Sequence, residues 1–260
     1  MTDTRFVILG YGRSGSTAFR NLLSQHENIQ AYGEVFRGRR GSGGQGGALV
    51  NGQSYKLGED SVAYLENTVF AAPNEFGKSC IGFKLFFYHL RADPVSYALW
   101  PYLIGRKDIK VIFLFRRNLF DCYVSQQRAQ RSGQFGLHKI RTTTDAHQTP
   151  FEIDLADCRD FMRTRAQVKA RLQEFFEAHD CLTIDYEALF AAPQEMMATA
   201  FRFLGEEPIE VGVKDRKLNR VPHREGITNF AQVVRSFRRT LFEDYFDPED
   251  LAADDARASS

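Results

Sequence analysis

The sequence of 260 residues is long enough for one large domain or two small ones with a substantial core. Hydrophobic residues make up 43% and charged residues 26%, a balance that excludes a disordered, collagenous or low-complexity chain. The 34 Lys and Arg residues nearly cancel the 33 Asp and Glu residues, so the net charge of +1 argues against a nucleic-acid partner attracted by bulk charge.

The first predicted strand is the apolar run at residues 6–9, which ends at a glycine. A loop follows at residues 10–17, and from Ala18 onward apolar residues recur at helical spacing. The chain therefore opens with a strand, a Gly/Ser loop and a helix. Farther on, residues 38–58 are rich in glycine and carry almost no large apolar side chain, which predicts a mobile loop or lid.

Three more buried strands and two helices are predicted downstream. The strands are expected at residues 81–87, 111–115 and 182–184, and the helices at about 157–179 and 194–204, the second ending at Gly205. Strands that alternate with helices favour right-handed crossovers and an open parallel sheet. We therefore expect an α/β fold, a three-layer αβα sandwich with a mainly parallel sheet. One domain over residues 1–246 and a polar C-terminal tail at 247–260 complete this prediction.

The four cysteines are scattered through the sequence without a C-x-x-C pair, which is typical of buried thiols in a reduced protein. The N-terminal residues lack the basic start and long apolar run of a signal peptide. The longest aliphatic and aromatic stretch, residues 111–115, is too short to cross a bilayer. These features predict a cytoplasmic protein without membrane insertion.

The loop at residues 10–17 has the composition of a phosphate cradle. In an open α/β sheet, ligands bind beyond the carboxyl ends of the strands, where glycines permit close approach and a helix N-terminus attracts anions. Ser14, Ser16 and Thr17 add hydroxyl donors. The Walker A loop of nucleotide kinases carries a lysine before its Ser or Thr, whereas the cation here is Arg13. An ordinary connecting turn is the alternative for this segment taken alone.

The third predicted strand runs into Arg116 and Arg117, at a place where a nucleotide kinase needs a metal-binding carboxylate. Two arginines favour an anion that the protein holds directly. The alternative for this pair taken alone is the solvated end of a strand.

Three segments in the same order carry a family resemblance. They are Arg13-Ser14-Gly15-Ser16-Thr17, then Arg117-Asn118 with Ser125 eight residues after Arg117, and finally residues 185–189 followed by Pro193 and residues 203–205. Together they resemble the sulfotransferases that use 3'-phosphoadenosine-5'-phosphosulfate (PAPS), which implies a P-loop-containing fold. In that family the first segment, including Gly15, holds the 5'-phosphosulfate, and Arg117 and Ser125 match the residues that hold the 3'-phosphate. A C-terminal cation often completes the 3'-phosphate pocket, and Arg220 is our candidate for it.

The first loop together with Gly33-Glu34 is similar to the bacterial carbohydrate branch of this family, which modifies trehalose, Nod-factor or lipopolysaccharide sugars. In that branch a glutamate after the first helix is the proposed catalytic base, and the resemblance implies this role for Glu34. The cytosolic branch has a Lys-x-His instead. Lys84 matches its lysine, no histidine follows two residues later, and His89 is a looser candidate for the base.

The resemblance implies a metal-independent enzyme that moves the sulfuryl group of PAPS in line to a hydroxyl of a carbohydrate or glycolipid. Arg13, with Lys84 as a second cation, is expected to stabilise the leaving phosphate. A carboxylate needs a raised pKa to be a good base, so we expect Glu34 to be partly desolvated. We expect Lys84 at the cleft end of its apolar strand. A nucleotide kinase and a non-catalytic nucleotide- or glycan-binding module are the alternatives.

Overall fold

The computed structural model describes residues 4–37, 47–71, 77–89, 94–133, 149–213 and 222–252. The chain divides into two compact units. We call them the sheet unit, Met1–Arg117 with Val168–Lys214, and the helical unit, Asn118–Gln167 with Asp215–Ser260. The expectation of one domain over residues 1–246 stays a prediction.

A five-stranded parallel sheet forms the centre of the sheet unit, in the order β2-β3-β1-β4-β5. The strands are β1 (Thr4–Gly10), β2 (Ile29–Tyr32), β3 (Cys80–Phe86), β4 (Lys110–Phe115) and β5 (Cys181–Asp185). The predicted α/β fold with a mainly parallel sheet is confirmed, as are the four predicted strands. The sequence does not predict β2, because this strand has only four residues and alternates buried with half-buried side chains.

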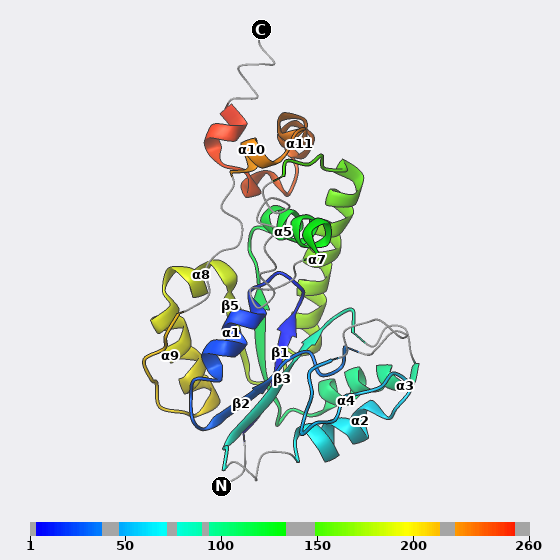
Figure 1. The fold of residues 1–260 in the computed structure, drawn as a ribbon, viewed down its shortest axis with the longest axis vertical. Coiled ribbons are helices and arrows are strands. Elements are labelled where there is room, and N and C mark those ends of the chain that lie inside the picture. The colour runs from blue at the N-terminus through cyan, green and yellow to red at the C-terminus, as the bar shows by residue number, and fades with distance from the viewer. Residues whose placement is uncertain are drawn as a thin grey trace. The chain divides into compact units, whose positions relative to one another are not determined.

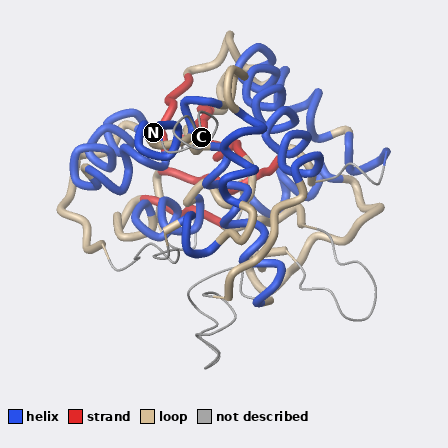
Figure 2. The backbone as a smooth tube through the Cα atoms, turned by 90° about the horizontal axis from the view of Figure 1, so that it is seen from above, coloured by secondary structure: helices blue, strands red, loops and turns tan. Residues whose placement is uncertain are grey.

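Helices cover both faces of this sheet, and in the view from above blue helices flank the red strands (Figures 1 and 2). One face carries α1 (Ser16–Leu23), α8 (Tyr186–Ala191) and α9 (Pro193–Leu204); the other carries α2 (Ser61–Tyr64), the π-helix η2 (Leu65–Val69), α3 (Pro94–Tyr97) and α4 (Leu99–Gly105). Phe6 packs with Phe19 and Phe201 on the first face. On the second face, the Phe83 ring lies 5.4 Å from that of Phe36. Because both faces are covered, the central strands are continuous apolar runs.

Residues 47–58, the described part of the glycine-rich segment, are held by two buried side chains. Val50 and Tyr55 are fully buried, and the Tyr55 ring lies 5.0 Å from that of Phe36 and 5.4 Å from that of Tyr64. Residues 38–46 lie outside the described residues, so the mobile lid stays a prediction.

The helical unit is built around aromatic side chains. Its elements are α5 (Leu119–Ser132), the first part of α7 (Leu155–Phe175), α10 (His223–Gly226), α11 (Phe230–Phe237) and the 3-10 helix η5 (Glu243–Tyr245). Phe120 and Phe246 pack with ring centroids 4.7 Å apart, and the Phe246 ring stacks on that of Phe237. Of the predicted tail, residues 248–252 are helical, and residues 253–260 lie outside the described residues.

The two predicted helices correspond to α7 and α9. The second ends where the sequence places its end, because Gly205 adopts a left-handed backbone (φ 88°) that suits a C-cap. The first ends at Phe175, earlier than predicted. A turn follows in which the His179 amide donates to the Phe176 carbonyl, 3.0 Å away.

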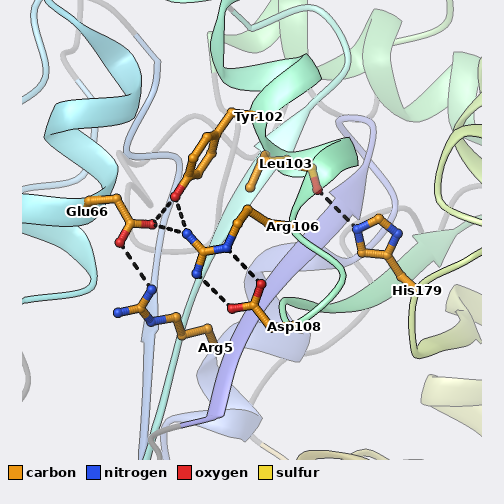
Figure 3. Close-up of polar contacts among 7 residues, drawn as sticks. All are labelled: Arg5, Glu66, Tyr102, Leu103, Arg106, Asp108 and His179. Carbon is orange, nitrogen blue, oxygen red and sulfur yellow. Dashed lines mark hydrogen bonds and ion pairs between the residues drawn. The ribbon is translucent and has the colours of Figure 1, made fainter.

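A polar network stabilises the amino-terminal edge of the sheet (Figure 3). Glu66 lies between two arginines, 3.1 Å from Arg5 and 3.0 Å from Arg106. Arg106 also forms a bidentate pair with Asp108, with both N···O distances 2.7 Å. Nearby, the His179 ring contacts the Leu103 carbonyl oxygen at 3.0 Å. These charges neutralise one another at the edge of the sheet opposite the loop that follows β1.

Gly82 provides a test of how closely the sheet is packed. It lies opposite Phe6 in the register of β1 and β3, and a Cβ at Gly82 would come within 2.4 Å of the Phe6 ring. We predict that Gly82→Ala lowers the free energy of unfolding by about 1–3 kcal/mol, the usual range for overpacking a core. Gly105→Ala in α4 is the control, because a Cβ there meets nothing within 4 Å. Equal unfolding free energies for the two variants in urea denaturation would contradict the packing.

Candidate active site

The loop at residues 10–17 is fixed by its own contacts. Gly15 has a left-handed backbone (φ 77°), and a Cβ there would come within 2.6 Å of the Tyr186 ring. Arg13 is also left-handed (φ 71°), a conformation that is rare for residues other than glycine and tends to occur at functional sites. The fully buried Ser14 donates its hydroxyl to the Tyr11 carbonyl at 2.8 Å, so in this conformation it stabilises the loop.

Helix α1 begins at Ser16 directly after this loop. Its N-cap is Gly15, which has no side chain with which to cap the helix. The first amides of a helix have no partner within the helix, and together with the helix dipole they favour an anion. The loop therefore has the backbone features of the predicted phosphate cradle.

Contacts among the loop, β4 and β5 hold the carboxyl edge of the sheet together. The Tyr11 hydroxyl donates to the Arg116 carbonyl oxygen at 3.0 Å. The Arg116 guanidinium lies 4.5 Å from the centre of the Tyr186 ring, which itself packs on Gly15. Sequence reasoning assigns no role to Tyr186, although it belongs to the segment at residues 185–189 that carries the family resemblance. Its function here is to hold the loop against Arg116.

Lys84 lies in β3, two residues before the end of the strand, and its side chain is only 4% exposed. Its Nζ lies 3.3 Å from both Ser16 Oγ and Thr17 Oγ1, and 3.6 Å from Glu34 Oε1. Burial lowers the pKa of Lys84, an effect that the Glu34 carboxylate opposes. The structure thus brings the predicted second cation, two loop hydroxyls and the predicted base together around one ammonium group.

Glu34 follows β2, and its position is fixed through the adjacent strand. The Lys84 amide donates to the carbonyl oxygen of Gly33, 3.1 Å away, beyond the end of β2. The Glu34 side chain is 23% exposed, in agreement with the expected partial desolvation. Its Oε2 lies 3.5 Å from His89 Nε2 and 3.8 Å from Arg37 Nη1.

The pKa of Glu34 differs from the expectation. Burial alone raises the pKa, but the His89 side chain and the charges of Lys84 and Arg37 outweigh burial and lower the pKa to about 2. Desolvation of the carboxyl group can be expected from the sequence, whereas the cations that surround it are brought there by the fold. Glu34 is therefore ionised throughout the neutral pH range.

The predicted 3'-phosphate residues belong to different parts of the chain. In the sheet unit, Arg117 is 64% exposed, and its Nε lies 3.8 Å from both Asp185 Oδ2 and Glu187 Oε2. In the helical unit, Ser125 is buried on α5. Arg220 lies outside the described residues. The roles of these three residues in binding stay predictions.

Asn118, the second residue of the Arg-Asn pair, has a clear structural role in the helical unit. Its side-chain oxygen accepts a hydrogen bond from the Asp121 amide at 2.9 Å and so caps α5. Its side-chain nitrogen donates to the Tyr245 carbonyl at 2.8 Å. Asn118 thus positions the helix that carries Ser125.

Within the described ranges, no group of three or more His, Cys, Asp and Glu side chains is placed to hold a metal ion. In the same part of the chain, no helix combines the length and apolarity that a membrane span requires.

The lowered pKa of Glu34 gives a stability prediction. A carboxyl group whose pKa falls from 4.5 to about 2 on folding stabilises the protein above pH 4.5 by about 3 kcal/mol, and the effect disappears as the pH falls toward 2. We therefore expect Glu34→Gln to lower the free energy of unfolding by about this amount at pH 7, and by much less at pH 2.5.

Urea denaturation at both pH values measures this difference. Glu59→Gln is the matched control, because Glu59 is 41% exposed and its contact with Lys56, at 3.8 Å, is a surface ion pair worth at most about 1 kcal/mol. A loss for Glu34→Gln that is the same at both pH values would contradict the ionised, stabilised carboxylate.

Comparison with known proteins identifies the family. Residues 3–225 match the sulfotransferase domain family. Nodulation protein H of Rhizobium meliloti (strain 1021) is 23% identical over 250 residues, which cover 93% of this chain and 94% of the relative. Nodulation protein H of Rhizobium tropici is 23% identical over 255 residues, 95% of each chain. Among solved structures, a sulfotransferase from Alicyclobacillus acidocaldarius matches with 16% identity and a TM-score of 0.47, over 97% of this chain and 96% of that one. The family match spans the loop after β1, Glu34, Lys84 and Arg117, and the chain belongs to the sulfotransferase domain family.

Proposed function

We propose that this sulfotransferase moves the sulfuryl group of PAPS to a hydroxyl of a carbohydrate or glycolipid. The observation that carries the proposal is the position of the Lys84 ammonium group, which contacts the loop hydroxyls on one side and Glu34 on the other. PAPS is the general donor of the family. Two observations support a carbohydrate acceptor. The sequence resembles the carbohydrate branch of the family, and the relatives with similar sequences are nodulation proteins. The predicted cytoplasmic location is part of the proposal.

The residues present fit the anionic end of the donor. The Lys84 ammonium group contacts the hydroxyls of the first two residues of α1, whose N-cap is a glycine, so a cation and a helix N-terminus meet at one place, which favours an anion. The loop amides, Ser16, Thr17 and Lys84 would hold the 5' end, and Arg13 would contribute a second cation. Arg117 and Ser125 would hold the 3'-phosphate, with Arg220 as the candidate third group. When bound, PAPS would supply an activated sulfuryl group. Transfer of this group would leave negative charge on the phosphate oxygen to which the sulfur was bonded.

Lys84 and Arg13 stabilise this developing charge, together with the amides of the loop. Preorganised donors of this kind are effective because the folded protein has already oriented them, and removing one typically costs a hundredfold to a thousandfold, on the order of 3–4 kcal/mol. For Arg117 to grip a phosphate, its guanidinium must exchange contacts with Asp185 and Glu187 for contacts with the ligand.

Glu34 accepts the proton of the acceptor hydroxyl. A carboxylate with a pKa of about 2 is a weak base toward a free alcohol, but the hydroxyl proton becomes strongly acidic as its oxygen bonds to sulfur. A base that is always ionised is then suited to a late proton transfer. An anion at the loop also competes with Glu34 for Lys84, and weakening this ion pair raises the pKa of Glu34. Donor binding thus makes Glu34 a stronger base.

Calorimetry with adenosine 3',5'-bisphosphate tests the donor site. We expect this bisphosphate to bind tightly with or without magnesium, because protein cations and amides hold its phosphates. ADP with magnesium is the comparison, since a nucleotide kinase would prefer it. Preference for Mg-ADP would overturn the proposal.

Two variants separate catalysis from donor binding. Glu34→Gln is expected to bind the bisphosphate at least as tightly as the wild type, because an amide does not compete for Lys84. The same variant is expected to lower turnover by about a hundredfold or more, the range for loss of a general base. Arg117→Ala is expected to weaken bisphosphate binding instead, because a phosphate loses its guanidinium.

Radiolabelled sulfate transfer from PAPS to a panel of sugars and glycolipids measures turnover, with Glu59→Gln as the control for an exposed carboxylate. Full activity in Glu34→Gln would show that Glu34 is not the base.

A further inference from the structure

His89 lies in a turn at the end of β3 and is held rigidly. Its amide donates to the Phe86 carbonyl oxygen at 2.8 Å, and its side chain is 3% exposed. The imidazole packs against two aromatic rings, with its centroid 5.2 Å from that of Phe86 and 5.1 Å from that of Tyr88. The ring therefore has little freedom to rotate.

A backbone contact fixes which ring nitrogen carries the proton. The Phe86 amide lies 3.2 Å from His89 Nδ1 and donates to it. An amide nitrogen only donates, so Nδ1 must present its lone pair, and the proton of the neutral ring lies on Nε2. Nε2 points to Glu34 Oε2 at 3.5 Å, and among the described residues it has no hydrogen-bond partner. A closer approach of a few tenths of an ångström would complete a hydrogen bond.

We propose that His89 is a positioning residue, a neutral imidazole that donates its Nε2 proton to Glu34, and that it is not the catalytic base. This inference rests on the proposed function of Glu34. To accept the acceptor's proton, His89 would have to be protonated at Nδ1 and lose the Phe86 hydrogen bond.

The geometry also gives the two carboxylate oxygens of Glu34 different roles. Oε2 faces His89, whereas Oε1 faces Lys84 at 3.6 Å. Only the contact with Lys84 weakens when an anion at the loop attracts the ammonium group. Oε1 is therefore the oxygen that becomes available to take the proton from the acceptor, while His89 holds the carboxylate in place through Oε2. Burial and the charge of Arg20 both lower the pKa of Lys84.

Nitrogen-15 NMR of the wild-type histidines tests the tautomer without any donor or acceptor. We expect His89 at pH 7 to be neutral with its proton on Nε2, its signals being assigned by their absence from His89→Gln. A ring protonated on Nδ1, or on both nitrogens, would overturn the inference. Because this measurement needs no turnover, it stands even if transfer from PAPS is not found.

Two substitutions test the role in turnover. The side-chain amide of His89→Gln can donate to Glu34 but does not accept a proton at neutral pH, whereas His89→Leu does neither. We expect His89→Gln to stay within about threefold of the wild-type kcat and His89→Leu to lose at least tenfold in kcat with little change in KM. Thermal denaturation checks that both variants are folded. If His89→Gln is as inactive as His89→Leu while the wild type is active, His89 takes part in proton transfer and the inference is wrong.

Discussion

The Lys84 ammonium group is the centre on which the site depends. Its side chain lies almost completely inside the sheet unit, where removing a charge from water costs several kcal/mol unless other groups compensate. The compensation comes from two directions, the hydroxyls of Ser16 and Thr17 and the carboxylate of Glu34. A small set of parallel strands makes this possible, because β3 lies between β1, which leads into the loop, and β2, which leads to Glu34.

The same constraint explains why a nearly neutral chain can provide an anion site. The net charge of +1 averages over the whole molecule and reveals nothing about where the charges lie. At the amino-terminal edge of the sheet, Arg5 and Arg106 are matched by Glu66 and Asp108 (Figure 3). At the carboxyl edge, Lys84 pairs with the partly exposed Glu34 and lies beside the N-terminus of α1, whose N-cap is a glycine. Local pairing, rather than total charge, determines which edge can take a ligand.

Much of the fold is predictable from the sequence, because the central strands are covered on both faces and appear as continuous apolar runs. Gly205 likewise predicts the end of α9. The short edge strand β2 is not predictable in this way, since its side chains alternate between buried and half-buried instead of forming a continuous apolar run, and four residues are at the lower limit for recognising that alternation. This omission has consequences for the site, because β2 is the element that carries the chain to Glu34.

The sequence also predicts which residues form the site better than it predicts the charges and pKa values of those residues. The family resemblance selects Glu34 and Lys84, and the structure brings them within 3.6 Å of each other. The sign of the pKa shift of Glu34, however, depends on several groups at once. Desolvation and the nearby cations act in opposite directions, and only the three-dimensional arrangement decides which is larger. For the same reason, the sequence leaves His89 as one of two candidates for the base.

Without ligand, Glu34, the proposed base, and Lys84, the proposed cation, form an ion pair with each other. This pairing has a consequence for the proposed mechanism. An ion pair that is stable without ligand keeps Lys84 compensated and Glu34 ionised, so neither group has to change its protonation state before the reaction. The interaction that stabilises the folded protein is also the one that a bound anion must weaken. In the proposed mechanism, some of the binding free energy of the donor would separate Lys84 from Glu34, and this would increase the basicity of Glu34 at the stage when a proton acceptor is needed.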